Sequence, residues 1–470
     1  MPSSPSTANR LNYLVQLMQR AIGNTITQKQ YWDEISRYGY SDEEIASGVT
    51  RFKELASKQT TAQNARVVPR RETVTDPIAG PVSTPDWALS SEVHALGQKI
   101  AEVSTRFKQQ ITYIPEKSLK SIRVKRLFFA PEPDTDLGKI PALRHNFVGH
   151  AGLQATASIL IVPGGVEIHD PLGGNEWERP EFKRYMQPLL KEEEKVFPEH
   201  GFSIQAGLDL DGNPLKKHNI IGLMVSGRKG SGKSQFLRQM TSELCLKHKP
   251  QHLKLALFDI QGSTFLGFEH SRWNFQPPCS DEHSYEAAME ALLTEAKRRE
   301  NLFRQERVSS IEQWNRTYPQ NPLCRIVVII DEFGETVSRL GMKKANHAPA
   351  SLSRANRKHG FDLVVATPTP DKNDFHPDLL RGLPDRIVFQ AADIGASYVA
   401  FGYNEDAGVF LLGKGDGFLK AGNTPIRFQG FWMGEDDGAS QIEKINAWGD
   451  HLYGPPEEVA DPWEAPCATA

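Results

Sequence analysis

The sequence predicts an α/β fold in which helices cover both faces of a mainly parallel sheet, and two observations lead to this prediction. From about residue 201 onward, short apolar runs alternate with amphipathic segments of helical period, as in parallel sheets that are buried on both faces. A glycine-rich loop joins the first of these runs to a helical segment. The fold is therefore expected to be built around this loop.

Five apolar runs of strand length define the expected sheet. They lie at 220–225, 253–258, 326–330, 363–366 and 386–390. Upstream of them, a helical segment over 88–110 and β-like runs at 122–130 and 157–162 indicate a separate, small α+β domain.

Five regions are predicted along the chain. They are an N-terminal helical region (1–58), a linker rich in Thr, Pro and Gly (59–87), the small α+β domain (88–200), the α/β core (201–450) and an acidic, Pro-rich, disordered tail (451–470). The N-terminal helices are interpreted as a small helical appendage, with a partner- or DNA-binding module as the alternative.

Composition is that of a soluble globular protein. The 470 residues are 39% hydrophobic and 24% charged, and the formal net charge is -3. A nucleic-acid partner would therefore need positive charge concentrated on one local surface. The four cysteines have no metal-binding or disulfide spacing, and no run approaches the roughly 18 apolar residues of a membrane span. We expect a cytoplasmic protein without membrane insertion.

The glycine-rich loop carries the strongest local signal. Residues 227–234 match the pattern G-x-x-x-x-G-K-[ST] in full, between a predicted strand and a predicted helix. Such a loop surrounds phosphates with backbone N–H groups and the positive end of a helix. Lys233 is expected to reach the β- and γ-phosphates of ATP, and Ser234 to bind Mg²⁺. The predicted nucleotide-binding residues are Gly227, Arg228, Lys229, Gly230, Ser231, Gly232, Lys233, Ser234 and Gln235.

A second acidic motif follows the apolar run at 326–330. Asp331 at the strand end is expected to hold Mg²⁺, and the adjacent Glu332 to orient and deprotonate the attacking water. The alternative is that Glu332 only caps the strand end. A cation for the transition-state charge is also needed, and an arginine from a neighbouring subunit often provides it. The candidates are Arg354, Arg357, Arg381 and Arg386.

Read in order, further phrases resemble those of the FtsK/SpoIIIE family of DNA translocases, within the FtsK–HerA class. The phrases are GLDLDGNP, LKLALFDIQG, KRRENLF, SSIEQWN, NRKHGFDLVVATPTP, LPDRIVFQ, LLGKGDGFL and TPIRFQGFW. The glycine-rich loop (Walker A) and the acidic pair (Walker B) occur in many unrelated proteins. The ordered series of further segments is specific to this family. The resemblance is strong from about residue 207 to about residue 432.

The resemblance implies a RecA-like P-loop NTPase core that hydrolyses ATP in a homo-hexamer with double-stranded DNA in its pore. By position, Arg357 aligns with the arginine that completes a neighbour's site, so Glu332 and Arg357 are the expected catalytic residues. Pro368 and Thr369 replace the family's sensor Gln-Arg. The family's membrane spans and C-terminal winged-helix domain are not expected here, which favours a motor of a plasmid, phage or transposon.

Two other functions stay open at this point. A conjugation or secretion ATPase of the same superfamily would move protein or a protein–DNA complex, and an ATP-dependent scaffold would hydrolyse slowly or not at all. Candidate pore loops lie at 341–347 and 369–373, with ordinary solvated loops as the alternative. A loading partner could bind the N-terminal region or the tail.

Overall fold

The computed structural model describes residues 90–453, except 174–175, 178, 183, 186–200, 423 and 435–438. The chain forms two units, Met1–Gly80 and Pro81–Ala470, and every described residue belongs to the second. The predicted N-terminal helices, the linker and the tail from residue 454 onward lie outside the described residues. The domain boundaries given above stay predictions.

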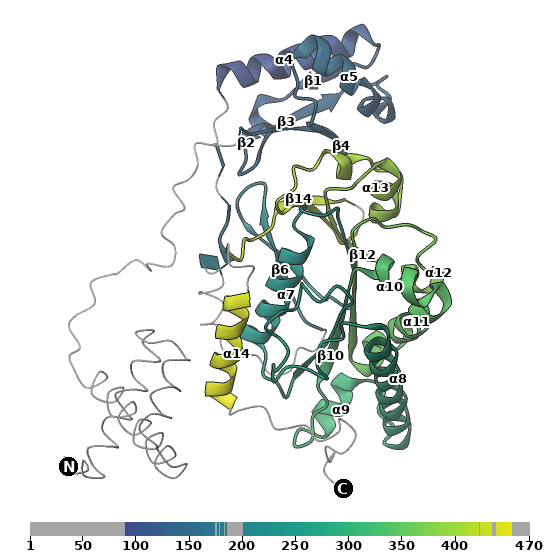
Figure 1. Ribbon diagram of the computed structural model, residues 1–470. Coiled ribbons are helices and arrows are strands. Elements are labelled where there is room, and N and C mark those ends of the chain that lie inside the picture. The colour runs from purple at the N-terminus through teal and green to yellow at the C-terminus, as the bar shows by residue number, and fades with distance from the viewer. Residues whose placement is uncertain are drawn as a thin grey trace, which may run out of the picture. The chain divides into compact units, whose positions relative to one another are not determined.

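The core is a nine-stranded sheet, of which one half is parallel and the other half is antiparallel (Figure 1). Its strands, in spatial order, are β7 (Pro214–Lys217), β6 (Ile204–Asp209), β14 (Ile426–Gln429), β13 (Asp416–Lys420), β12 (Asp385–Phe389), β8 (Gly222–Ser226), β11 (Phe361–Thr367), β10 (Arg325–Asp331) and β9 (Leu253–Asp259). Neighbours from β12 to β9 pair in parallel, and those from β7 to β12 pair antiparallel.

The parallel half corresponds to the five apolar runs found in the sequence, and the α/β prediction is confirmed. The sheet is nevertheless mixed, because β6, β7, β13 and β14 add an antiparallel half that was not predicted. These strands are short and contain glycine or partly exposed polar residues, as in the Asp-Gly start of β13. They therefore lack the continuous apolar character of strands buried on both faces.

Helices cover both faces of the sheet. They are α7 (Lys233–Lys247), α8 (Glu282–Gln305), α9 (Ile311–Thr317), α10 (Phe333–Leu340), α11 (Met342–His359), α12 (Pro377–Gly382), α13 (Ile394–Phe401) and α14 (Ala439–Tyr453). In β10, Val327 and Ile329 join the apolar cluster that contains α7 residues, whereas Val328 and Ile330 join the cluster that contains α8 and α11 residues. This alternation follows the period-two geometry of a strand.

A smaller antiparallel sheet precedes the core. Its strands are β1 (Ile111–Tyr113), β2 (Leu119–Lys120), β3 (Val124–Pro131), β4 (Ser158–Val162) and β5 (Gly165–Pro171). Helix α4 (Ser91–Arg106) packs on the sheet through Ile100 and Val103, which share a core with Leu127 and Phe129. The helix and the strands β3 and β4 match the sequence-based expectation.

Buried polar contacts join the small sheet to the core. Arg427 on β14 forms two hydrogen bonds with Asp416 on β13, of 2.9 and 2.7 Å, and its Nη1 donates to the Ser158 hydroxyl on β4 at 2.9 Å. Arg123 donates from Nη2 to the Gly413 carbonyl at 3.3 Å. The turn that precedes β13 is therefore held from the side of the small sheet.

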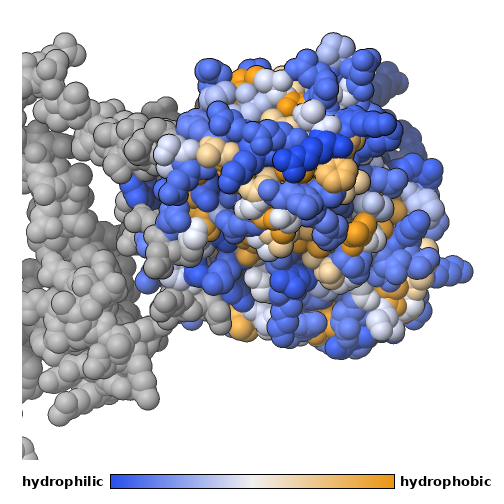
Figure 2. Space-filling model, turned by 90° about the horizontal axis from the view of Figure 1, so that it is seen from above, coloured by the Kyte–Doolittle hydropathy of each residue, from blue (hydrophilic) through white to orange (hydrophobic). Residues whose placement is uncertain are grey.

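None of the described helices combines the length and the hydropathy needed to cross a bilayer. On the coloured part of the face in Figure 2, hydrophilic side chains predominate and hydrophobic ones lie between them in small groups. Many apolar side chains of the described residues are buried in clusters between the sheets and the helices.

Candidate nucleotide-binding site

The phosphate-binding loop runs from the end of β8 to the start of α7, at the end of the sheet where the parallel strands finish. Gly227 has φ +153° and Gly232 has φ +119°, both in the region that favours glycine. A Cβ atom at Gly227 would lie 2.5 Å from Phe389 Cβ, and one at Gly232 would lie 2.6 Å from the Gly415 nitrogen. Glycine is therefore required at both positions for the loop to pack against its neighbours.

Lys233 lies between the two acidic residues that follow β10. Its ammonium group contacts Asp331 Oδ1 and lies 2.9 Å from Glu332 Oε1. Burial disfavours the charge of Lys233, but the two carboxylates outweigh burial and raise its pKa. The lysine thus stays protonated, and the phosphates of a bound nucleotide would compete with these carboxylates for it.

Asp331 is enclosed by donors. Its side chain is 1% exposed, its Oδ2 accepts a hydrogen bond from the Thr264 hydroxyl at 2.7 Å, and its Oδ1 accepts one from the Glu332 N–H at 2.8 Å. Thr264 is placed in turn by its own N–H, which donates to Asp259 Oδ2 at 2.6 Å. The sequence indicated Asp259 through the FtsK-like phrase but gave no signal for Thr264.

Glu332 occupies an unusual backbone conformation for a residue with a side chain. Its φ and ψ are +52° and +46°, in the left-handed region, at the N-cap of α10. Strain of this kind concentrates at functional sites. The carboxylate is 17% exposed and lines the cavity described next, so it is accessible to a water molecule there.

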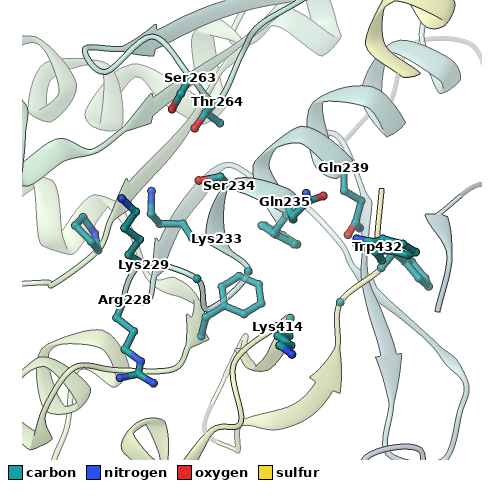
Figure 3. Close-up of a pocket in the computed structure, with 18 of the residues that line it drawn as sticks. Arg228, Lys229, Lys233, Ser234, Gln235, Gln239, Ser263, Thr264, Lys414 and Trp432 are labelled. Atoms are coloured by element: carbon teal, nitrogen blue, oxygen red, sulfur yellow. The ribbon is translucent and has the colours of Figure 1, made fainter. Parts of the chain in front are cut away.

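A cavity of about 610 Å³ extends from the phosphate-binding loop across the sheet edge (Figure 3). Every predicted nucleotide-binding residue except Gly227 and Ser231 lines it. Its walls also include residues that were not recognised in the sequence, from the segment before the core and from the turns around β13 and β14. These are Arg179, Lys414, Gln429, Phe431 and Trp432.

The turn before β13 forms part of the site because it bonds directly to the phosphate-binding loop. The Gly415 N–H donates to the Ser231 carbonyl at 2.7 Å. On the neighbouring strand end, Gln390 accepts from the Arg228 N–H and from the Arg228 Nε, both at 2.9 Å. Arg228 is thereby held beside Gln390, and the loop is fixed from two sides.

The oxygen atoms at this site are suited to Mg²⁺, which prefers hard oxygen ligands and keeps several waters. Ser234 offers a hydroxyl in the cavity, and Asp331 offers a carboxylate at the strand end. Within the described part of the chain, no group of three His, Cys, Asp or Glu side chains could hold a metal alone. A magnesium ion here would therefore need phosphate oxygens and water as further ligands.

The four candidate arginines lie in different surroundings. Arg357 belongs to α11, and its side chain is outside the described residues. Arg354 and Arg381 are exposed, and both form ion pairs with Asp378. Arg386 is 7% exposed, and burial lowers its pKa to about 10. Little of its guanidinium is therefore presented to a neighbouring subunit, and its role as a trans arginine stays an untested prediction.

The two candidate pore loops also differ. Residues 342–347 are the first turns of α11 and not a loop, because Gly341, with φ +80°, ends α10 and the next helix begins at once. Lys344 there pairs with Glu286 on α8 at 2.9 Å. Residues 369–373 do form a loop, between β11 and α12, in which Asp371, Lys372 and Asn373 are exposed.

Comparison with known proteins agrees with this geometry. The model of the FtsK/SpoIIIE family matches residues 197–372. The DNA translocase FtsK of Staphylococcus epidermidis is 28% identical over 306 residues, which are 61% of this chain and 38% of the translocase. The chain thus spans about two fifths of the length of this relative.

Two solved structures share the fold. The conjugation coupling protein TcpA of pCW3 aligns with a TM-score of 0.50 and 19% identity, over 74% of this chain and 99% of TcpA. The type VII secretion ATPase EccC of Thermomonospora curvata aligns with a TM-score of 0.50 and 25% identity, over 58% of this chain and 33% of EccC. Together with the loop and the Asp-Glu pair, the family match identifies residues 197–372 as a P-loop ATPase domain of the FtsK/SpoIIIE type.

Proposed function

We propose that this chain is an ATP-hydrolysing motor that works in the cytoplasm as a homo-hexameric ring and translocates double-stranded DNA for a mobile element. The observation that carries the hydrolysis part is the cluster of Lys233, Asp331 and Glu332 beside a complete phosphate-binding loop. A nucleotide-binding switch needs no second carboxylate at this position, whereas water activation does.

Each residue of the cluster has a role in this proposal. Lys233 leaves the two carboxylates and neutralises the β- and γ-phosphates of ATP. Its departure frees the Glu332 carboxylate, which then orients a water molecule and accepts its proton. Ser234 and Asp331 hold Mg²⁺, and the bound ion supplies charge stabilisation for the transferring phosphoryl group.

Arg357 is proposed to act on the neighbouring subunit's site. Two of the cationic side chains that line the cavity are engaged, Arg228 with Gln390 and Lys233 with the carboxylates, whereas Arg179, Lys229 and Lys414 also line it. A guanidinium placed on α11 of the adjacent copy would add a further positive charge only when the ring is assembled. Hydrolysis would then depend on assembly.

The DNA part of the proposal comes from the relatives. The FtsK proteins among the relatives are named DNA translocases. A sequence-independent motor contacts phosphates through a few basic and polar groups in each subunit. The exposed loop at 371–373 provides one lysine for each copy, so a ring of six would present six. This loop is the proposed pore contact.

A conjugation coupling ATPase is the second candidate, and one observation favours it. The alignment covers 99% of the solved TcpA chain and 74% of this chain, and so extends beyond the motor core. Such a motor would also act on DNA but would work with a membrane-bound partner complex. A loading partner at the N-terminal region or the tail fits both candidates.

Duplex-stimulated ATP hydrolysis is the decisive test. We expect the assembled protein with Mg²⁺ to hydrolyse ATP faster when linear duplex is added, and Glu332→Gln to bind ATP while turnover falls by at least about 100-fold. Glu335→Gln is the matched control, because Glu335 lies one helical turn away and pairs with exposed Arg339. Unchanged turnover with duplex would refute the DNA motor, and normal turnover of Glu332→Gln would refute the catalytic assignment.

Electron micrographs test the assembly. With an ATP analogue and duplex, rings of six subunits encircling DNA are expected. Monomers or open filaments under the same conditions would contradict the proposed hexamer while leaving the hydrolysis assay to be judged on its own result.

A further inference from the structure

The turn that follows β9 forms part of the wall of the nucleotide-binding site. It spans residues 260–264, directly after the strand. Ser263 and Thr264 of this turn line the cavity together with Ser234. In Figure 3, the two turn residues lie on the Ser234 side of the cavity, away from Trp432. The turn therefore belongs to the part of the site that contains the candidate Mg²⁺ ligand Ser234.

Asp259 uses both of its carboxylate oxygens to hold this turn. Its Oδ1 accepts a hydrogen bond from the Gln261 N–H at 3.1 Å, and its Oδ2 accepts one from the Thr264 N–H at 2.6 Å. Asp259 is buried and is the register partner of Asp331, so two carboxylates end the adjacent parallel strands β9 and β10. Asp259 shapes the turn, which leaves Asp331 as the candidate metal ligand of the pair.

The Thr264 hydroxyl links the turn to Asp331. It donates to Asp331 Oδ2 at 2.7 Å, and both residues are buried. The other oxygen, Oδ1, is engaged by Lys233 and by the Glu332 N–H. Bonds at both oxygens fix the plane of the carboxylate. Each carboxylate oxygen has two acceptor sites, so Oδ2 can bind Mg²⁺ or a water of that ion while it keeps its bond to Thr264.

Arg238 attaches the same turn to α7, the helix that carries Ser234. Its Nε donates to the Thr264 carbonyl at 2.8 Å, and its Nη2 donates to the Ser263 carbonyl at 2.7 Å. Arg238 is buried and lies four residues after Ser234, on the same face of α7. A guanidinium is a rigid fork of donors, so it fixes the direction of the turn as well as its distance. A continuous set of hydrogen bonds thus runs from α7 through the turn to Asp331.

We propose that Arg238 and Thr264 are positioning residues for Mg²⁺. They hold the two candidate ligands, Ser234 on α7 and Asp331 on β10, at the spacing that one ion requires. Mg²⁺ demands near-ideal octahedral geometry with short bonds to oxygen, so a small displacement of one ligand weakens its binding. The proposal rests on the proposed nucleotide-binding function and adds the residues that adjust its metal site. Binding of the phosphates without metal does not need these residues, because the loop and Lys233 provide it.

Calorimetric titration of the full chain with the slowly hydrolysed γ-thio analogue of ATP tests this role. Each protein is titrated once with Mg²⁺ and once with EDTA, and the measured quantity is the ratio of the two affinities. Thr264→Val removes the hydroxyl with little change of shape. We expect this ratio to fall by at least about tenfold, as when a group that orients a metal ligand is lost, while the affinity in EDTA stays the same. Thr264→Ser keeps the hydroxyl and should retain the wild-type ratio.

Arg238→Met tests the α7 side of the connection. The ratio should again fall with the affinity in EDTA unchanged, because the turn loses its attachment to the helix that carries Ser234. Arg238→Lys should restore part of the ratio, since an ammonium group can donate to the same carbonyls but lacks the rigid fork. A wild-type ratio in Arg238→Met would overturn the part assigned to this residue. If Arg238→Met does not fold, the Thr264 variants decide.

Thr241→Val is the matched control for Thr264→Val. Thr241 is also buried, but its hydroxyl donates to the Leu237 carbonyl within α7 at 2.7 Å, outside the cavity lining. The control should leave the ratio unchanged. A wild-type ratio in Thr264→Val would overturn the positioning role while nucleotide binding stands, and so would an equal loss of affinity with Mg²⁺ and with EDTA. If the wild-type chain bound the analogue under neither condition, the proposed nucleotide-binding function itself would be refuted.

Discussion

Replacing Arg427 by methionine should be among the most destabilising single changes in the core. Its guanidinium and the Asp416 carboxylate are both 1% exposed and form two hydrogen bonds. Methionine removes one partner and leaves the other charge buried. Breaking a buried ion pair in this way costs about 3–5 kcal/mol. The Leu412 N–H, which donates to Asp416 Oδ2 at 2.7 Å, stays in place, so we expect the lower half of this range.

Urea unfolding followed by circular dichroism measures this cost. A chain of this size can unfold in more than one step, so the first transition is compared between variants. Ser158→Ala keeps the ion pair but removes the hydrogen bond from Arg427 Nη1, and it should cost about 1 kcal/mol. Arg304→Met is the matched control, because Arg304 pairs with Glu300 at the surface, with 71% and 52% of the side chains exposed. It should cost no more than about 0.5 kcal/mol.

The comparison between Arg427→Met and Arg304→Met decides the matter. If the two variants unfolded at the same urea concentration, the buried pair would contribute no more than a surface pair, and the reasoning from burial would be refuted. If Ser158→Ala lowered the free energy of unfolding as much as Arg427→Met, the destabilisation would come from the lost hydrogen bond to Ser158 and not from the broken ion pair.

Three further predictions concern hydrolysis and pH. Thr264→Val should lower ATP turnover by about tenfold, the equivalent of one hydrogen bond to Asp331, and unchanged steady-state kinetics would contradict this. Arg357→Ala subunits should bind ATP but not activate a neighbour, so mixing them with Lys233→Ala subunits should restore part of the activity; inactivity at every ratio would count against an arginine acting between subunits. Burial lowers the pKa of His248 to about 3, below the roughly 6.5 of an unfolded chain. Protons therefore bind the unfolded state first, and unfolding free energy should fall as pH drops below 6.5, by at most about 1.4 kcal/mol for each pH unit down to the folded pKa. His248→Gln should make the slope shallower, and an unchanged slope in urea titrations would refute this assignment.

Local sequence predicted the parts of the site that are contiguous in the chain. The phosphate-binding loop and the Asp331–Glu332 pair each contain their chemistry within a few residues, next to apolar strands that are easy to recognise. Thr264, Arg179 and Trp432 carried no such signal, because they reach the cavity only through tertiary packing of segments far apart in sequence. Their presence in the site follows from how the chain folds and not from any pattern within one element.

The antiparallel half of the sheet is the other part that the sequence did not predict, and it matters for the site. Strands β13 and β14 are short and partly polar, so their sequences lack the continuous apolar run of a strand buried on both faces. The turns at their ends nevertheless provide Lys414, Gln429 and Trp432 to the cavity. An analysis of the sequence that is limited to apolar runs therefore finds the phosphate-binding loop and misses the part of the cavity wall formed by these residues.

The turn at residues 413–415 connects the phosphate-binding loop to the small sheet. On one side, the Gly415 N–H bonds to the Ser231 carbonyl. On the other, the Gly413 carbonyl accepts from Arg123, which is 4% exposed and stacks on Trp177 at 3.4 Å. Burial removes the freedom of Arg123 to follow a displaced partner, and densely packed contacts of this kind transmit strain. The phosphate-binding loop and the small sheet are therefore connected through this turn, by the Gly415 bond on one side and the Arg123 bond on the other.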